Sequence, residues 1–576
     1  MPRPVRHPLL ALASGAVVAA AGSLATLQAA GAPPPTPWPA EMERAAASIT
    51  ATELRASLRF LASDLLEGRG TGHPGNERAA LYLATMLERL GLEPVAGGTF
   101  RQKVPLVTPR LGEPNRLELR EAHAREERVT RLESGRDFSP VVGSGSGQIT
   151  AELAFVGYGI SAPEAGHDDY ADVDVRGRVV IAFMGQPRLA GAPRPFDGQH
   201  AQVARKVAVA AERGAAALLL IPTSARRVLE GSRLAWPVAD SPRSARFALE
   251  NTIHAMPVVN VSGDAAWKLI ASPSTPATSL DALETAVADA IAVPAEERRG
   301  AGPRTSFTVQ GRRVTVATTV IHEPVVAHNV LAMIEGADPK LRHELVIVGA
   351  HFDHDGFDDE GRIFNGADDD GSGTVGVIEI AEAFARAAAE GRRPRRTVVF
   401  ALWNAEEKGL LGSQHYVDHV APAGGVPVVK LNMDMIGRSE EVPERQDPRF
   451  HGLAPTRAAD NANVLHLLGY SRSPDLADIV HAQNAAIGLT LRTEYDFHEQ
   501  NLLQRSDQWP FLQKRVPAAY FTTGLHPDYH TPDDDVDRID FAKMERIVRL
   551  VFRTAWHVAN VETPPQYREP TPSTDQ

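Results

Sequence analysis

Apolar segments that end in metal-ligand residues constrain this chain more than any other feature. Residues 345–350 form an apolar run with β-branched side chains, as in a strand buried on both faces of a sheet. The run ends at His351 and Asp353, and Asp369 follows just before an apolar-periodic stretch typical of a helix. Open α/β sheets bind ligands beyond the carboxyl ends of their strands. The pattern therefore predicts a site at that edge of the sheet.

Three further predicted strands end in the same way, and predicted helices lie between them. These strands, each with the residues that follow it, are 396–404 with Glu406 and Glu407, 426–431 with Asp434, and 516–521 with His530. Taken singly, each of these side chains is most simply a solvated surface group. Their recurrence at the ends of buried strands indicates a common site in an α/β fold with a largely parallel sheet.

The composition limits the chemistry of such a site. The apolar fraction is 43% and the charged fraction 23%, as in ordinary globular proteins. A net charge of −12 gives no sign of nucleic acid or an anionic membrane as a partner. The chain has no cysteine, which excludes disulfides, thiolate ligands and a cysteine nucleophile. Any metal must therefore be held by His, Asp and Glu.

The amino-terminal residues have the features of a targeting segment. Arg3 and Arg6 precede an alanine-rich apolar stretch, and small residues follow at 29–32. This pattern predicts a signal peptide over residues 1–32, export to the periplasm or the extracellular space, and no stable membrane insertion after cleavage. An uncleaved anchor is the alternative, because the apolar stretch is at the lower edge of membrane-spanning length.

A block of short strands with turn signals interrupts the α/β pattern. It begins near residue 147, contains no concentrated His/Asp/Glu cluster, and ends in an alanine- and proline-rich stretch. We predict the following organisation: residues 40–146 as the first part of a catalytic domain, 147–302 as an inserted β-rich domain, 303–562 as the rest of the catalytic domain, and 563–576 as a disordered tail.

The residues at the strand ends match the needs of metal-assisted hydrolysis. Two divalent metals about 3.5–4 Å apart can clamp a water molecule and polarise a carbonyl group. Zinc suits ligation by imidazole and carboxylate groups without thiolates. Glu406, the first of an adjacent Glu pair, is a candidate to accept the proton of the water. The sequence thus indicates hydrolysis of an acyl bond.

Five short motifs resemble those of the M28 family of di-zinc exopeptidases and occur in the family's order. They are GAHFDH, NGADDDGSG, WNAEEKGLLGS, NMDMIGR and DYHTPDD. The resemblance covers most of residues 327–561 and includes the stretch GTGHPGNERAALYLATMLERLGLEP. The inserted block is similar to a protease-associated (PA) domain in DYADVDVRGRVVIAF and KVAVAAERGAAALLLI. The resemblance implies a mixed, largely parallel central sheet flanked by helices, with an inserted β-rich PA domain.

The resemblance implies two zinc ions as cofactors and assigns their ligands by motif. His351 and Asp434 would hold one ion, and Glu407 and His530 the other. Asp369 would bridge the two ions.

Supporting roles are implied in the same way. Glu406 would be the general base, and Asp353 would orient a histidine ligand. Asp370 would follow the bridging aspartate through a cis peptide bond, and Tyr529 is a weaker candidate for an oxyanion contact. One departure is Ser-Asp-Gln at residues 506–508, where many relatives have Ser-Asp-His. It lies outside the ligand motifs, so the difference bears on a supporting role in the pocket and does not affect the prediction of metal binding.

The leading hypothesis is a secreted aminopeptidase that acts on peptides. A dipeptidase or carboxypeptidase and a glutaminyl cyclase remain open, because we find no residue that decides how the pocket reads the substrate's terminus. A non-catalytic receptor or adaptor built on the PA domain is disfavoured by the intact ligand set. The sequence does not predict the oligomeric state.

Overall fold

The structure, a computed structural model, describes most of residues 38–570. Within that range the residues left out are 96, 124–125, 188, 190–194, 197, 225–233, 235, 237–240, 294–305, 420–424, 446 and 499. The predicted signal peptide, residues 1–32, lies outside the described residues. Residues 1–39 form one unit and residues 40–576 another. Among the described residues, no helix combines the length and the apolar character needed to cross a membrane.

A large mixed sheet positions the predicted site. Its centre consists of parallel strands in the order β18 (Thr397–Trp403), β15 (Glu344–His351), β19 (Val426–Met433) and β22 (Ala518–Thr522). Antiparallel neighbours extend it: β14 (Val320–Ile334), β2 (Arg101–Leu111) and β11 (Ala248–Leu249) beyond β18, and β20 (Val464–Leu468) beyond β22. Two short strands complete it, β1 (Glu93–Pro94) beside β14 and β21 (Thr490–Arg492) beside β20. The predicted fold class is confirmed.

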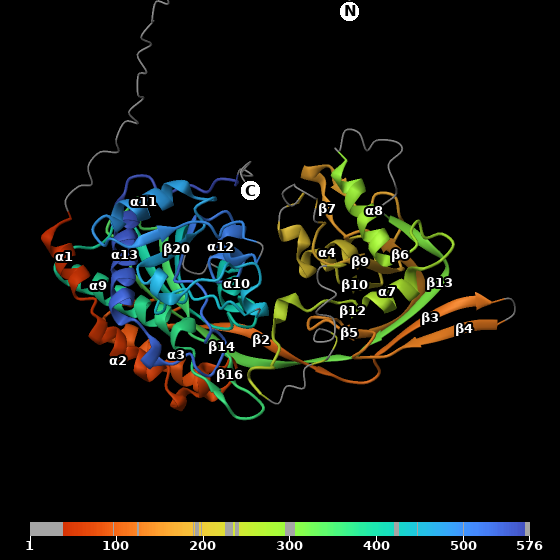
Figure 1. Ribbon diagram of the computed structural model, residues 1–576, viewed down its shortest axis with the longest axis horizontal. Coiled ribbons are helices and arrows are strands. Elements are labelled where there is room, and N and C mark those ends of the chain that lie inside the picture. Colours follow the sequence, from red (N-terminus) through yellow and green to blue (C-terminus); the bar gives the residue numbers. More distant parts are fainter. Residues whose placement is uncertain are drawn as a thin grey trace, which may run out of the picture. The chain divides into compact units, whose positions relative to one another are not determined.

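Helices cover both faces of this sheet (Figure 1). On one face, Phe400 of β18 lies 5.7 Å, ring to ring, from Phe384 of α9 (Gly373–Ala389), which contacts Phe552 of α13 (Phe541–Asn560) at 5.2 Å. On the other face, Trp403 contacts Tyr416 of α10 (Leu411–Asp418) at 5.1 Å. Successive strand residues point to opposite faces, so both faces need apolar side chains. This is why the central strands read as continuous apolar runs.

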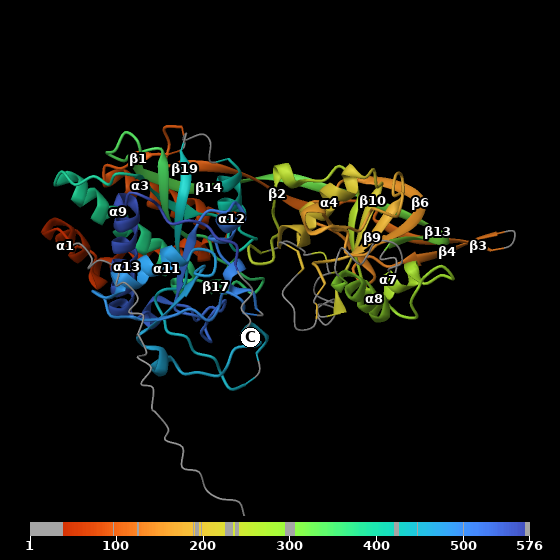
Figure 2. The same cartoon turned by 90° about the horizontal axis from the view of Figure 1, so that it is seen from above.

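The remaining helices of this part pack around that core. They are α1 (Ala40–Ala47), α2 (Ala51–Leu61), α3 (Pro74–Arg89), α11 (Pro474–Asn484) and α12 (Trp509–Gln513). Helices α1, α2 and α11 contact α13, and Figure 2 shows α1 and α11 near α13 from above. Helix α12 packs beside α10, where Phe511 lies 6.0 Å from the ring of Trp403. The parallel strands are therefore closed on both faces and open only at their ends.

A second sheet forms the β-rich block and has its own apolar core. Its strands, in spatial order, are β4 (Glu126–Leu132), β3 (Arg116–His123), β13 (Ser306–Thr318), β6 (Gly147–Val156), β9 (Val179–Phe183), β10 (Ala217–Ile221), β12 (Val258–Val261) and β5 (Phe138–Pro140). Its helices are α4 (Val203–Glu212), α7 (Gly263–Ile270) and α8 (Leu280–Ala292). The boundaries of the insert stay a prediction, and this sheet takes strands from both sides of residues 147–302.

The carboxyl-terminal segment packs on the body of the protein at residues 564–569. The Arg568 backbone N–H donates to the Arg472 carbonyl at 2.7 Å, and the Gln566 backbone N–H donates to the Asp475 carboxylate at 3.1 Å. The structure here differs from the predicted disordered tail, because these hydrogen bonds and an Arg515–Glu569 ion pair hold residues 564–569 against the rest of the protein. Residues 571–576 lie outside the described range.

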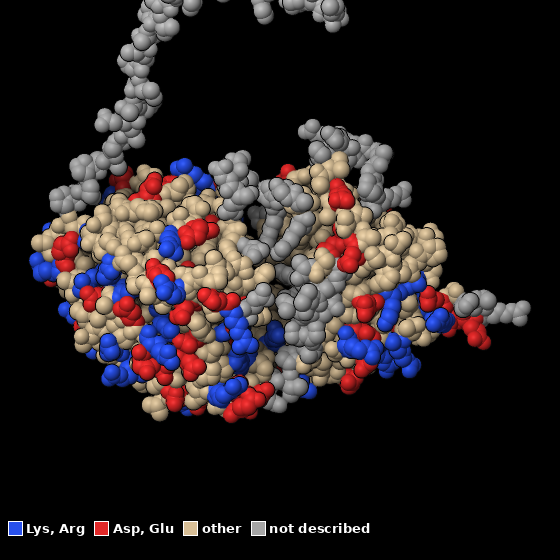
Figure 3. Space-filling view, viewed as in Figure 1, with Lys and Arg blue, Asp and Glu red and all other residues tan. Residues whose placement is uncertain are grey.

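Charged side chains are mixed on the face shown in Figure 3. Lys and Arg lie among Asp and Glu there and do not gather into a patch of one sign. Proteins that bind the phosphate backbone of nucleic acids do so with clustered basic residues. This face therefore has no such basic track over its described residues.

Arg69 connects the amino-terminal helices to the loops that carry the predicted site. Its side chain is fully buried. Its guanidinium donates to the carbonyl oxygens of Phe352 and Asn365, both at 2.6 Å, of Leu61 at 2.8 Å, and of Gly366 at 2.9 Å. Burial lowers the pKa of Arg69 to about 10, so the group stays charged at neutral pH. These carbonyls flank His351 and Asp369, so Arg69 holds both loops at once.

Replacing Arg69 should destabilise the protein strongly. Arg69→Met removes the donor to four carbonyl groups, and each buried group left unpaired costs roughly 1–3 kcal/mol. We expect the free energy of unfolding, measured by urea denaturation, to fall by about 3 kcal/mol or more. Arg59→Met, on the exposed face of α2, is the control and should change stability by less than about 0.5 kcal/mol. Equal stability of the two variants would contradict the role given to Arg69.

Candidate active site

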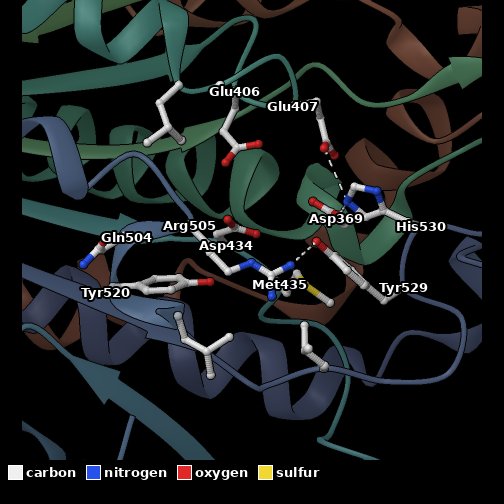
Figure 4. A pocket seen from close by; sticks show the side chains of 14 residues that line it. Asp369, Glu406, Glu407, Asp434, Met435, Gln504, Arg505, Tyr520, Tyr529 and His530 are labelled. Carbon is white, nitrogen blue, oxygen red and sulfur yellow. Dashed lines mark hydrogen bonds and ion pairs between the residues drawn. The ribbon is translucent and has the colours of Figure 1, made fainter. Parts of the chain in front are cut away.

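The ends of the central strands surround a pocket of about 380 Å³. Figure 4 shows Asp369, Glu406, Glu407, Asp434 and His530 in this pocket. The sixth predicted residue, His351, is buried beside them, with its Nε2 atom 3.3 Å from Asp369 Oδ1 and 3.7 Å from Asp434 Oδ2. The structure thus brings together all the predicted ligands and the predicted base.

Asp369 lies between two groups of ligand atoms. Its Oδ1 atom faces His351, and its Oδ2 atom is 3.1 Å from His530 Nε2. The same His530 nitrogen is 3.3 Å from Glu407 Oε2. Donor atoms that share one tetrahedral zinc ion, each about 2.0–2.1 Å from it, lie roughly 3.3 Å from one another. The residues therefore fit two ions that share one carboxylate.

Unsatisfied buried oxygens support the same fit. Among the described residues, Asp369 Oδ2 and Glu407 Oε1 are buried and have no hydrogen-bond partner of acceptable geometry. Burying a carboxylate is costly unless it is paired or coordinates a metal. Divalent cations would compensate these oxygens.

The loop that presents Asp369 depends on a glycine. Gly366 has φ of +54°, and a Cβ atom there would lie 2.2 Å from the Asp369 carbonyl oxygen and 2.5 Å from the ring of His354. Only glycine fits this backbone conformation without strain. The Asp369–Asp370 peptide bond is cis, as the resemblance implies. The Asp370 carboxylate accepts from the backbone N–H of His351 at 3.1 Å, which fixes the end of β15 against this loop.

Asp353 positions two site residues rather than one. The main-chain carbonyl of Asp353 is 3.0 Å from His351 Nδ1, whereas its carboxylate is 3.8 Å from that nitrogen. The carboxylate accepts from the backbone N–H of Glu406 at 3.0 Å and from the Thr71 hydroxyl at 3.1 Å. Asp353 therefore holds the proposed base in place, and its backbone orients the histidine.

Two further residues that the sequence reasoning missed also contact the ligands. His354 Nδ1 lies 2.8 Å from Glu407 Oε1, and Asp355 Oδ2 lies 3.3 Å from His530 Nδ1. His354 closes the GAHFDH motif and Asp355 follows directly, so the strand-end argument could have included both. A neighbouring carboxylate that orients a histidine is the usual support for a metal-ligating imidazole.

A segment of the β-rich block reaches the same loops. The Arg243 guanidinium is 3.4 Å from the Asp355 carboxylate and donates to the His530 carbonyl at 3.3 Å. The Lys408 ammonium, next to Glu407 in the chain, donates to the Pro242 carbonyl at 3.1 Å. The block provides no predicted ligand, but Arg243 contacts the predicted ligand His530 and also Asp355, which lies against the His530 ring.

The departure at residues 506–508 places a buried glutamine beneath the pocket. Gln508 is fully buried. Its side-chain oxygen accepts from the Asn432 amide at 3.0 Å, and its amide donates to the Leu503 carbonyl at 2.7 Å. Gln508 therefore holds the loop at residues 502–505 against β19, and it is not among the residues that line the pocket.

The carboxylates and histidines strongly perturb one another. Burial raises the pKa of Glu406 well above its ordinary value, and the charge of Glu407 adds to the rise. Burial by itself lowers a histidine pKa, but Glu406 beside His351 and Glu407 beside His530 outweigh it, so both histidine pKa values are raised well above normal. Both histidine shifts therefore favour the protonated imidazole wherever no metal ion compensates these carboxylates.

Tyr529 can act as a hydrogen-bond donor at the pocket. Burial raises the pKa of Tyr529 to about 12, so the phenol is neutral at physiological pH. Its oxygen accepts from Arg505 Nη2 at 2.9 Å. The phenolic O–H is therefore left to donate to another acceptor in the pocket.

The comparison with known families identifies this part of the chain. Residues 329–555 match the sequence profile described as Peptidase family M28. This segment belongs to family M28. The predicted M28-type metallopeptidase is thus confirmed for these residues, which contain all the predicted ligands.

Curated relatives and solved structures are similar over larger parts of the chain. A probable zinc metalloprotease of Leptosphaeria maculans is 28% identical over 299 residues, which are 48% of this chain and 67% of that protein. Aminopeptidase YwaD of Bacillus subtilis is 26% identical over 239 residues, 39% of this chain and 44% of that protein. A solved aminopeptidase from Aneurinibacillus sp. strain AM-1 is 18% identical with a TM-score of 0.46, covering 93% of this chain and 98% of that one.

Zinc binding should displace protons from the cluster. Because the pKa values of His351 and His530 are raised, both must lose protons before they bind zinc. Zinc titration of metal-free protein at pH 7, by calorimetry in buffers of different ionisation enthalpy, should show two ions per chain and release of about one proton or more. Affinity should fall as pH decreases. One ion or fewer, or heats independent of the buffer, would contradict the shared site.

Proposed function

We propose that this chain is an exported di-zinc aminopeptidase that removes amino-terminal residues from peptides. One observation carries the proposal: the two carboxylate oxygens of Asp369 face different histidines, His351 and His530, at 3.3 and 3.1 Å. A carboxylate shared in this way is the central element of a two-metal hydrolytic site. Export is supported by the signal-peptide pattern of residues 1–32.

The ligands divide into two sets. His351 and Asp434 would hold one zinc ion, Glu407 and His530 would hold the other, and Asp369 would contact both. Bound zinc supplies a Lewis acid that polarises a carbonyl group and makes a water molecule more acidic.

Glu406 is the group placed to move the proton. Its backbone is held by Asp353, its carboxylate lines the pocket, and its pKa is raised by burial, as suits a base that works near neutral pH. Glu406 accepts a proton from the water molecule that attacks the scissile carbonyl carbon. It then returns this proton to the amine nitrogen as the carbon–nitrogen bond breaks. Tyr529 can donate its O–H to the carbonyl oxygen as negative charge develops there.

The charge of the pocket supports the direction of cleavage. Four carboxylates line it, those of Asp369, Glu406, Glu407 and Asp434. Two zinc ions would compensate Asp369, Glu407 and Asp434, which leaves Glu406 as the carboxylate that can attract a positively charged amino terminus. This favours an aminopeptidase over an enzyme that accepts a blocked amine. The PA-like identity of the β-rich block is part of the same proposal and is supported by its sequence motifs and its separate sheet.

Substitution of Glu406 and of its neighbour Glu407 should reduce activity for different reasons. Glu406→Gln cannot accept the proton, so kcat should fall about 10³-fold while both zinc ions remain. Glu407→Gln removes a ligand, so zinc content and activity should fall together. Zinc content and kcat are measured on the same preparation. Glu360→Gln, on an exposed turn, is the matched control and should resemble the wild type in both. Near-normal turnover of fully loaded Glu406→Gln, or zinc loss from it, would refute the assignment.

A substrate panel tests the direction of cleavage. Leucine anilide should be hydrolysed, and N-acetyl-leucine anilide should not, because acetylation removes the positive charge that Glu406 would attract. The rate of anilide release with and without added zinc is the measurement. Equal cleavage of both substrates would point to a different exopeptidase activity, and cleavage of neither would refute the proposed function.

A further inference from the structure

Arg505 brings a positive charge into an otherwise acidic pocket. Figure 4 shows its side chain across the pocket from Glu406 and Glu407, next to Tyr529. Arg505 Nη2 donates to the Tyr529 hydroxyl at 2.9 Å, and Nη1 donates to the Gln500 side-chain oxygen at 3.1 Å. Both partners are neutral. Within the described part of the chain, no carboxylate forms an ion pair with Arg505, and its side chain is exposed to solvent.

Other arginines near the pocket are neutralised. Arg438 pairs with Asp528 at 2.8 Å, and Arg449 pairs with Asp447 at 2.8 Å. Arg505 uses only part of its donor set, since a guanidinium has five N–H groups in a planar fork that matches a carboxylate. Its free charge is therefore available to a ligand.

The position of Arg505 is fixed relative to the catalytic residues. The three residues that follow it, 506–508, are fully buried. Asn432 of β19 donates to the Ser506 hydroxyl at 2.9 Å and to Gln508 at 3.0 Å. Asn432 precedes the proposed ligand Asp434 by two residues on the same strand end. A short, anchored connection thus links the guanidinium to the metal-binding edge of the sheet.

The surroundings of Arg505 favour a carboxylate as its partner. Glu406, the pocket carboxylate that is not a proposed zinc ligand, repels an anionic substrate group, so such a group needs a cation placed to receive it. Leu502, Met435 and Leu525 also line the pocket and would shield the pocket-facing side of an ion pair formed there from part of the solvent. An ion pair of this kind, bidentate and partly desolvated, is stronger than one in bulk water.

We propose that Arg505 binds a carboxylate of the peptide substrate and sets a preference for substrates that carry one close to the scissile bond. This inference rests on the proposed peptidase function. Two sources can supply the carboxylate. It is either the side chain of an amino-terminal Asp or Glu, or the free carboxyl terminus of a dipeptide. Both present the same group to Arg505, and isosteric neutral substrates separate them.

The experiment compares matched substrate pairs on the zinc-loaded full chain. The pair Leu-Gly and Leu-Gly amide tests the carboxyl terminus, and the pair glutamyl anilide and glutaminyl anilide tests the side chain. In the wild type, one pair should show a kcat/KM ratio of about 10 or more in favour of the charged member, because a hydrogen bond to a charged group contributes roughly 1.5–3 kcal/mol. The pair that shows this kcat/KM ratio identifies which carboxylate, the carboxyl terminus or the side chain, binds to Arg505.

The variants decide whether Arg505 causes the preference. In Arg505→Gln the ratio should fall to about 1, and in Arg505→Lys, which keeps the charge but not the fork, it should be intermediate. Arg457→Gln, whose exposed guanidinium pairs with Asp460 at 3.0 Å, should keep the wild-type ratio. Zinc content is measured in all preparations. Equal values show that a change in the kcat/KM ratio does not result from loss of metal.

A binding measurement separates this inference from the proposed function. If the wild type cleaves none of these substrates, the proposed function fails, and calorimetric titration with the same compounds then tests Arg505 alone. The charged member of one pair should bind about tenfold more tightly than its neutral partner to the wild type, and equally to Arg505→Gln. No preference within either pair, or a preference that persists in Arg505→Gln, overturns the inference.

Discussion

The concentration of buried negative charge around Asp369 is the constraint on which the site depends. Asp369, Asp370 and Asp434 are buried within one edge of the sheet, together with Glu406. Carboxylates packed this closely repel one another and lose their hydration, so they persist only with cations or donors beside them. The histidines His351 and His530 and the buried Arg69 are those partners in the described structure, and the same arrangement provides the ligands for two divalent ions.

Backbone N–H groups donate hydrogen bonds to several of these carboxylates and their neighbours and so fix their orientation. The Asp370 carboxylate accepts from the backbone of His351, and the Asp534 carboxylate accepts from the backbone N–H of Asp369 at 3.0 Å. The Asp353 carboxylate holds the backbone of Glu406. Asp370, Asp534 and Asp353, which do not line the pocket, therefore each fix the backbone of a proposed site residue. A functional centre needs this support, because small errors in the placement of its groups reduce catalysis steeply.

Chemistry and specificity come from different parts of the chain. The proposed ligands and base follow the parallel strands, where both faces are covered by helices and only the strand ends are open. Arg505 and Leu502 come from a loop outside the ligand motifs, anchored through Gln508 to β19. The β-rich block reaches the same region through Arg243. Loops of this kind can change the substrate preference of a site without changing its ligand set.

The sequence determined the parts of this protein that depend on local pattern. Continuous apolar runs predicted the central strands, because a strand buried on both faces cannot alternate polar and apolar residues. Residues at the ends of those strands predicted the site, since parallel strands deliver their carboxyl ends to one edge. His351, Asp369, Glu406, Glu407, Asp434 and His530 meet there for this reason. The cis peptide bond at Asp369 and the mixed sheet followed from the resemblance to family M28.

Only the tertiary structure decided which distant groups meet. Arg69 donates to carbonyls at residues 352, 365 and 366, and the Asp353 carboxylate binds Thr71 and the backbone of Glu406 instead of the ring of His351. The contact of Asp355 with His530 and the unpaired charge of Arg505 also arise between segments far apart in sequence. A single sequence carries no periodic signal for such contacts, because they depend on how loops pack after the sheet has formed.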